Sequence, residues 1–152
     1  MSVTLEEARR IVSAARAAGR AHQMMPLTVA VLDSGGHLVA LEREDGSGII
    51  RVEIATGKAY AALGMGVPTR LLRDRLADRP NFVSGLAAAA EGRFIAVPGG
   101  VLIRQDGRII GAVGISGDTS DRDEFCAITA IQAVGLVADP DAPTPGWEQS
   151  RL

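Results

Sequence analysis

Cysteine, aromatic residues and an excess of charge of one sign are all scarce in this chain of 152 residues. The single cysteine, Cys126, excludes an internal disulfide and fits a reducing compartment. Aromatic residues make up 3% of the chain, so few rings are available to stack on a flat ligand. The formal net charge of -2 excludes the basic surface that draws proteins onto nucleic acids or anionic lipids. We therefore expect neither a nucleic-acid nor a membrane partner.

Long apolar runs and targeting signals are also missing. No apolar run approaches the ~18 residues that a membrane span requires. The first residues do not combine a basic segment with a following apolar segment, so the sequence predicts a cytoplasmic protein. Two histidines and one cysteine show no zinc-ligand spacing, and we predict no metal site. Cys126 has helical spacing with Ala130 and Ala133, which favours a buried packing thiol over a nucleophile.

Hydrophobic residues make up 47% of the chain, enough for one domain to bury a core without disulfides or metals. Hydrophobic periodicity, turn residues and capping residues predict the elements. Helices are expected over residues 4–22, 50–63, 68–77 and 120–137, with 82–90 open between helix and other structure. Strands are expected over residues 27–32, 37–43, 94–97, 101–105 and 108–116. Hairpin connections imply an α+β domain with one five-stranded antiparallel sheet flanked by helices, at residues 1–138, before an extended proline-rich tail at 139–152.

A group of charged residues forms the candidate site. Arg51 and Lys58 are seven residues apart, hence on one face of the predicted helix, and Arg43 ends the strand that leads toward it. These three cations could bind a carboxylate or a haem propionate through charge-assisted hydrogen bonds. Glu53 and Lys58 are the candidate catalytic residues, with Asp33 as an alternative proton carrier. The same residue types also fit an ordinary solvated helix face.

Several glycine-rich motifs occur in a characteristic order. They are VLDSGGHL at 31–38, EIATGKAYAA at 53–62, PT at 68–69, PGGVLI at 98–103, DG at 106–107, GAVGISG at 111–117 and DE at 123–124. The chain therefore resembles the GlcG/HbpS family, also called haem-degrading or DUF336 domains, over roughly residues 4 to 137. It is similar as well to the C-terminal domain of PduO-type corrinoid adenosyltransferases.

The resemblance implies a profilin-like fold and homo-oligomers from dimers to octamers. It also implies haem as a candidate cofactor, since some members bind or degrade haem. A threonine often lies in the matching helix of haem-binding members, and Ala61 stands at that position here. The chain therefore departs from the family pattern at the position that the resemblance associates with this mode of haem ligation.

Three functions remain open at this point. The chain could be a cofactor-free lyase or isomerase acting on a small carboxylate, with Arg43, Arg51 and Lys58 binding the ligand. It could instead be a haem-binding or haem-degrading protein, or a non-catalytic oligomeric partner of a pathway enzyme. We expect the pocket to lie at a subunit interface, because so small a domain has little room to enclose a site of ~300 Å³ or more.

Overall fold

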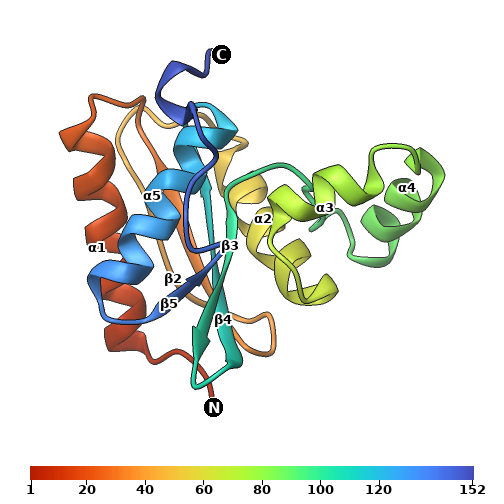
Figure 1. Cartoon of the computed structure of the whole chain (residues 1–152), viewed down its shortest axis with the longest axis horizontal. Coiled ribbons are helices and arrows are strands. Elements are labelled where there is room, and N and C mark those ends of the chain that lie inside the picture. The colour runs from red at the N-terminus through yellow and green to blue at the C-terminus, as the bar shows by residue number, and fades with distance from the viewer.

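The computed structural model describes all 152 residues and contains one five-stranded sheet with helices on both faces (Figure 1). The helices are α1 (Leu5–Ala21), α2 (Arg51–Met65), α3 (Thr69–Leu76), α4 (Pro80–Ala89), α5 (Ser120–Ala133) and the 3-10 helix η1 (Trp147–Gln149). The strands are β1 (Thr28–Asp33), β2 (Leu38–Arg43), β3 (Gly100–Gln105), β4 (Arg108–Ser116) and β5 (Val137–Asp139). All neighbours in the order β2-β1-β4-β3-β5 are antiparallel, which confirms the predicted α+β fold.

Helices α1 and α5 pack side by side on one face of the sheet, and α2 lies on the other (Figure 1). The main core fills the space between the sheet and the α1–α5 layer. Helix α1 begins with a capping box in which Thr4 and Glu7 exchange hydrogen bonds. Ile11 and Ala15 then point its apolar face into the core. The alternation of buried and exposed positions in α1 thus fixes its orientation on the sheet.

Helix α2 lies unusually close to strand β4 because small residues line their contact. A Cβ atom added at Gly114 would overlap the carbonyl oxygen of Ala55 in α2. Ala59 and Ala62 of α2 pack with Ala112 of β4 in a second apolar cluster. This close approach positions the first turn of α2 against the last residues of β4.

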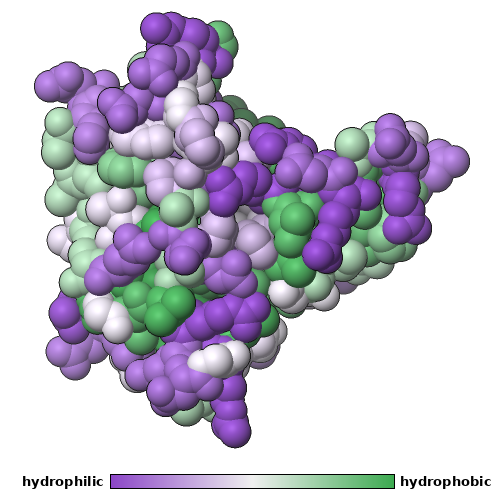
Figure 2. Space-filling view, viewed as in Figure 1, coloured by the Kyte–Doolittle hydropathy of each residue, from purple (hydrophilic) through white to green (hydrophobic).

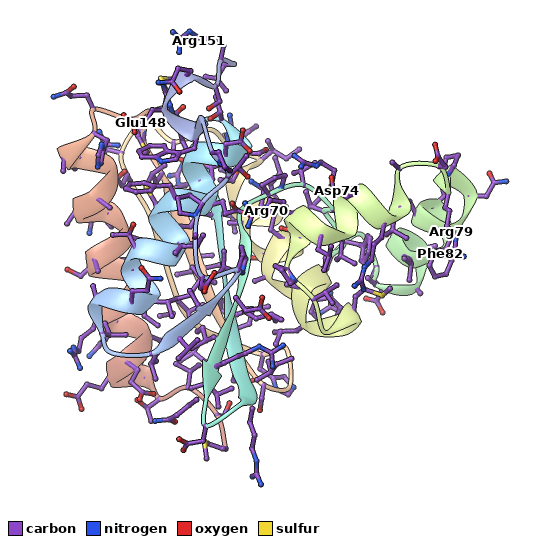
Figure 3. The ribbon with its side chains drawn as sticks, viewed as in Figure 1. Arg70, Asp74, Arg79, Phe82, Glu148 and Arg151 are labelled. Carbon is purple, nitrogen blue, oxygen red and sulfur yellow. The ribbon has the colours of Figure 1, made fainter.

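Helices α3 and α4 form an arm that projects from the sheet on the side of α2 (Figure 1). Helix α4 has no buried residue, and hydrophobic residues lie among strongly hydrophilic ones along the arm's surface (Figure 2). Arg79 places its guanidinium carbon 4.2 Å from the ring centre of Phe82 near the arm's outer end (Figure 3). The alanine-rich segment at residues 82–90, which the sequence left open, is thus helical as far as Ala89, as its helix propensity favours. It forms this helix without being buried in the domain core.

Three predictions about individual elements were wrong. Residues 94–97 form no strand, because Phe94 packs into the apolar cluster between α2 and the arm rather than onto the sheet. Helix α5 ends at Ala133, and Val137 belongs to β5, the actual fifth strand. The segment after β5 is not extended throughout, because η1 forms within it and Trp147 stacks on Phe125 with ring centres 3.8 Å apart.

Candidate functional site

Arg51 is the first residue of α2 and reaches the end of strand β4. Its guanidinium Nη1 donates a 3.0 Å hydrogen bond to Ser116 Oγ. Lys58, two turns later on the same helix face, donates a 2.8 Å bond to the carbonyl oxygen of Ile115. The predicted common face of Arg51 and Lys58 is therefore correct, and it faces β4 and the start of α5.

A polar cleft of about 430 Å³ opens beside Arg51. It is lined by Arg51 of α2, Arg73 of α3, residues 118–121 at the start of α5 and residues 150–152 at the end of the described chain. The N-terminus of α5 contributes the positive end of its helix dipole to this cleft. The side chains of three arginines and two aspartates line it.

One of the two aspartates of the cleft, Asp118, is already held by protein donors. Asp118 accepts hydrogen bonds from the backbone N–H groups of Met25 at 2.8 Å and Thr119 at 2.7 Å, and forms an ion pair with Arg122 at 3.2 Å. Burial alone would raise the pKa of Asp118, but these donors outweigh it and hold that pKa below its usual value. The cleft arginines have fewer partners: Arg51 bonds only Ser116, and Arg73 pairs with its exposed neighbour Asp74.

Lys58 lies beneath the site and is enclosed by protein. Its Nζ lies 3.2 Å from Asp123 Oδ2, and the two side chains are 2% and 1% exposed. Burial lowers the pKa of the Lys58 ammonium and raises the pKa of Asp123 to about 6, while the mutual attraction of the pair opposes both shifts. The sequence predicts Lys58 to be a ligand-binding and catalytic residue. The structure does not support that role, because the Lys58 ammonium is buried and already bonded to Asp123 and to the Ile115 carbonyl oxygen.

The other predicted site residues do not join Arg51. Glu53 is exposed on the opposite side of α2, in a separate cleft of about 350 Å³ with Thr56 and Arg93. Arg43 is exposed and donates to the Ser47 carbonyl oxygen at 3.2 Å. Asp33 accepts the N–H groups of Gly35 and His37, both at 2.9 Å, and these bonds lower its pKa. Asp33 therefore stabilises the β1–β2 turn rather than moving a proton in the cleft.

A second buried carboxylate lies deeper in α5. Glu124 is fully buried, neither of its oxygens accepts a hydrogen bond, and burial raises its pKa. Arg70 Nη1 lies 3.3 Å from Glu124 Oε1 and provides the compensating charge. Arg70 also donates to Thr144 Oγ1 at 2.7 Å, so it joins α3, α5 and the C-terminal segment.

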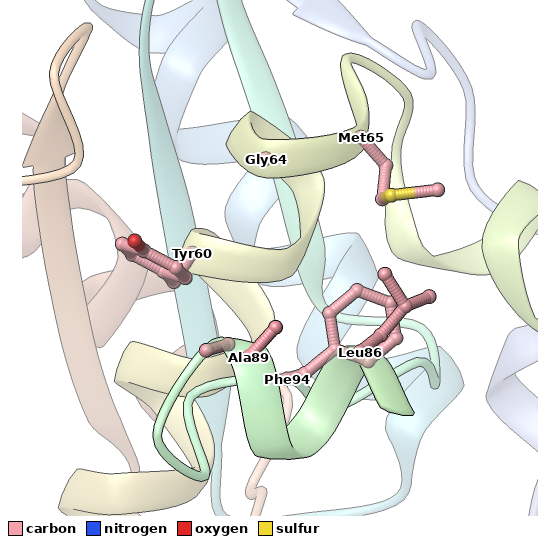
Figure 4. A pocket seen from close by; sticks show the side chains of 7 residues that line it. Tyr60, Gly64, Met65, Leu86, Ala89 and Phe94 are labelled. Carbon is pink, nitrogen blue, oxygen red and sulfur yellow. The ribbon is translucent and has the colours of Figure 1, made fainter. Parts of the chain in front are cut away.

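An apolar pocket of about 170 Å³ separates α2 from α4, with Leu86 and Phe94 at its centre (Figure 4). Tyr60 and Met65 have side chains of types that ligate haem iron, but in Figure 4 they lie at opposite ends of the pocket. The volume is below the ~300 Å³ typical of pockets that enclose a ligand. The residues of a single chain therefore do not enclose a haem, although the edge of one could contact this pocket.

Sequence reasoning missed Arg73 and the residues at 118–121 and 150–152. Arg73 lies in α3, a helix with several arginines, and nothing in the sequence distinguishes the one that lines the cleft from the others. Asp121 lies in the first turn of α5, where acidic residues are common in any helix, and the N-cap itself is Thr119, which accepts from the Arg122 N–H at 3.3 Å. No group of three or more histidine, cysteine, aspartate or glutamate side chains in the chain is placed to hold a metal ion. None of the helices is both long and apolar enough to cross a membrane.

The fold and the cleft define a class of protein: a single antiparallel sheet between two helical layers, with a polar cleft at one end of the sheet. Residues 3–132 match the family model described as haem degrading protein HbpS-like. The chain belongs to this HbpS-like family, which confirms the resemblance found in its motifs.

Relatives and solved structures of the family cover most of the chain. An uncharacterized 15.0 kDa protein of Citrobacter freundii, from the dhaT-dhaS intergenic region, is 29% identical over 86% of this chain and 90% of its own length. The corrinoid adenosyltransferase PduO of Salmonella typhimurium is 31% identical over 77% of this chain, which spans only 35% of that protein.

Two crystal structures share the fold. A PduOC:heme complex superposes with a TM-score of 0.81 and 26% identity, over 91% of this chain and 99% of the other. HbpS superposes with a TM-score of 0.76 and 28% identity, over 88% and 90%. Haem is thus bound by at least one protein of this fold.

Proposed function

We propose that this chain binds a small organic carboxylate in the cleft beside Arg51. The observation that carries the proposal is the convergence of Arg51, Arg73 and Arg151, from three separate segments, on one cleft of about 430 Å³. That volume lies within the ~300–1,000 Å³ typical of small-molecule sites. Guanidinium groups bind carboxylates through paired, charge-assisted hydrogen bonds, and Arg51 has no carboxylate partner in the protein.

Arg51 is the residue best placed to orient such a ligand. Its bond to Ser116 Oγ fixes the guanidinium against β4 and leaves its other N–H groups free of protein acceptors. The N–H groups at the start of α5 add a positive potential to the same cleft. The proposal is one of binding; a lyase or isomerase reaction remains a prediction, because Glu53 and Lys58 lie outside the cleft.

Calorimetric titration with succinate, against its uncharged diamide succinamide, tests this proposal. We expect succinate to bind and succinamide not to bind. Arg51→Met should weaken succinate binding about tenfold or more, as expected for loss of a charged hydrogen bond. Arg108→Met, at the exposed opposite end of β4, is the matched control and should bind normally. Equal affinity of the wild type for both compounds would reject a carboxylate site.

Haem binding is a second candidate, favoured by the haem complex of PduOC. The apolar pocket between α2 and α4 offers Leu86 and Phe94 to one edge of a macrocycle. Because one chain does not enclose the group, we propose that haem binds at an open surface or between two copies of the chain. The predicted homo-oligomer is therefore part of this candidate.

A Soret titration at micromolar haem tests the second candidate, with iron-free protoporphyrin as the matched ligand. A saturable shift of the haem band supports haem binding, and unchanged spectra contradict it. Binding of the iron-free porphyrin with equal affinity would indicate apolar adsorption without axial ligation. Sedimentation with and without haem reports whether two copies are needed.

A further inference from the structure

The residues after β5 cross α5 and α3 and end at the polar cleft. We call residues 140–152 the C-terminal strap. The side chains of Gln132, Arg70 and Arg122 donate to its carbonyl oxygens, at Asp141 (2.8 Å), Ala142 (3.1 Å) and Glu148 (2.9 Å). These anchors are spread along the strap, so its path over the domain is fixed at several points rather than at its end alone.

An aromatic contact anchors the middle of the strap. Trp147 stacks on Phe125 of α5, with an angle of 10° between the rings, and the His22 ring packs edge-on against both. Three residues further along the strap, the hydroxyl of Ser150 shares a 2.5 Å hydrogen bond with the hydroxyl of Thr119, the residue that caps the N-terminus of α5. The strap therefore reaches the start of α5 with Ser150 held at the edge of the cleft.

This path places Arg151 in the wall of the cleft that contains Arg51. Figure 3 shows Arg151 at the upper end of the molecule. Its Nη1 donates only to the backbone oxygens of Gln149 and Ser150, at 3.1 and 3.2 Å, and no carboxylate pairs with it. Arg151 is thus a cation without a counter-ion, on a segment separate from that of Arg51.

The strap also lies outside the part of the chain that matches the family model, which ends at residue 132. The cleft consequently has two sources of cations: Arg51 and Arg73 from the family domain, and Arg151 from the strap. A ligand with one carboxylate can use the domain alone. A ligand with two carboxylates has a guanidinium group available from each source.

We propose that the C-terminal strap makes the cleft selective for dicarboxylates, with Arg151 as the specificity-determining residue for the second carboxylate. This inference rests on the proposed carboxylate-binding function. The strap supplies the second charge only while Trp147 remains stacked on Phe125, so the aromatic contact is a positioning element for Arg151.

Succinate and butyrate, which have the same number of carbon atoms and two or one carboxylates, test the proposal by calorimetry on the full chain. We expect the wild type to prefer succinate. Arg151→Met should lower succinate affinity about tenfold and lower butyrate affinity by much less, so that the preference for succinate falls. Arg108→Met is again the control. Arg51→Met should weaken both ligands, because it acts on the carboxylate that they share.

A second measurement follows the strap itself. Trp147 is the only tryptophan of the chain, so its fluorescence reports the strap alone. Phe125→Leu should shift its emission to the red, increase quenching by acrylamide and reduce the preference for succinate. This variant keeps Arg151, so it separates loss of position from loss of charge.

The outcomes distinguish the two proposals. If Arg51→Met weakens both ligands while Arg151→Met leaves the succinate preference unchanged, the strap proposal is wrong and the carboxylate site stands. If the wild type binds the two ligands equally, the strap proposal is also wrong. If the wild type binds neither ligand, both proposals fail together.

Discussion

At the scale of single residues, the buried pair of Lys58 and Asp123 is the feature that departs furthest from expectation. Removing one member of a buried ion pair leaves the other charge without compensation and costs about 3–5 kcal/mol. We expect Lys58→Met to lower the free energy of unfolding by that amount, as measured by urea denaturation. Lys58→Met combined with Asp123→Leu should recover part of it, because neither charge of the pair is then left without its partner, although the Asp118 N–H loses Asp123 Oδ1, its acceptor at 3.0 Å. An unchanged stability of the single variant would contradict this account.

Cys126 provides a second test at this scale. It is fully buried, its Sγ lies 3.3 Å from the sulfur of Met24, and burial raises its pKa to about 12. At pH 8 the thiolate form that reacts with alkylating reagents is therefore a negligible fraction. Iodoacetamide should leave the native protein unmodified and label one thiol after denaturation in urea. Rapid labelling of the native protein would show that α5 opens.

At the scale of elements, the contact of α2 with β4 decides where Arg51 lies. Gly114→Ala should destabilise the protein strongly or prevent folding, because the new methyl group would overlap the backbone of Ala55. Gly85→Ala in α4 is the matched control, since no atom lies within 4 Å of its added Cβ. The control should raise stability by about 0.4–1 kcal/mol through the unfolded chain and helix propensity. Thermal unfolding of both variants measures the difference.

Hydrophobic periodicity predicted most of the elements, because local patterns determine them. The hairpins around residues 33–37 and 106–107, the helix at 51–65 and its shared face for Arg51 and Lys58 all follow from spacing and turn residues. The predictions that were wrong concern segments whose structure depends on tertiary contacts. The apolar run at 94–97 packs under the arm, and the three residues of β5 pair with β3 although they are too short to give a sequence signal.

The candidate site was predicted only in part for the same physical reason. Arg51 was identified, but Arg73, Asp121 and Arg151 come from segments far apart in sequence. Nothing in the spacing of those residues distinguishes them from other exposed charges. The sequence also gives no sign that Lys58 faces the interior, because a lysine in a helix is normally exposed. Only the close approach of α2 to β4 decides its environment.

At the scale of the whole molecule, the arm of α3 and α4 contrasts with the sheet. Helix α4 has no buried residue, whereas the central strands β1 and β4 are almost entirely buried. Segments with few buried apolar contacts open at a lower free energy than the core. Within a dilute monomer, the amides of α4 should exchange hydrogen much faster than those of β4. Hydrogen exchange followed by mass spectrometry of peptides covering residues 80–89 and 108–116 measures this contrast.

If the amides of α4 exchange slowly instead, two further measurements identify the cause of their protection. Gly85→Ala should slow exchange in α4 a few-fold, because it replaces a helical glycine that costs about 0.8–1.0 kcal/mol relative to alanine. If α4 of the wild type is protected only at high protein concentration, a second copy covers the arm, in keeping with the predicted homo-oligomer. If it is as protected as β4 at every concentration, the arm is stabilised within one chain. The exposed surface of α4 would then be a rigid part of the domain, and its protection would have to come from the contacts of Leu86 and Ala90 with the cluster around Phe94.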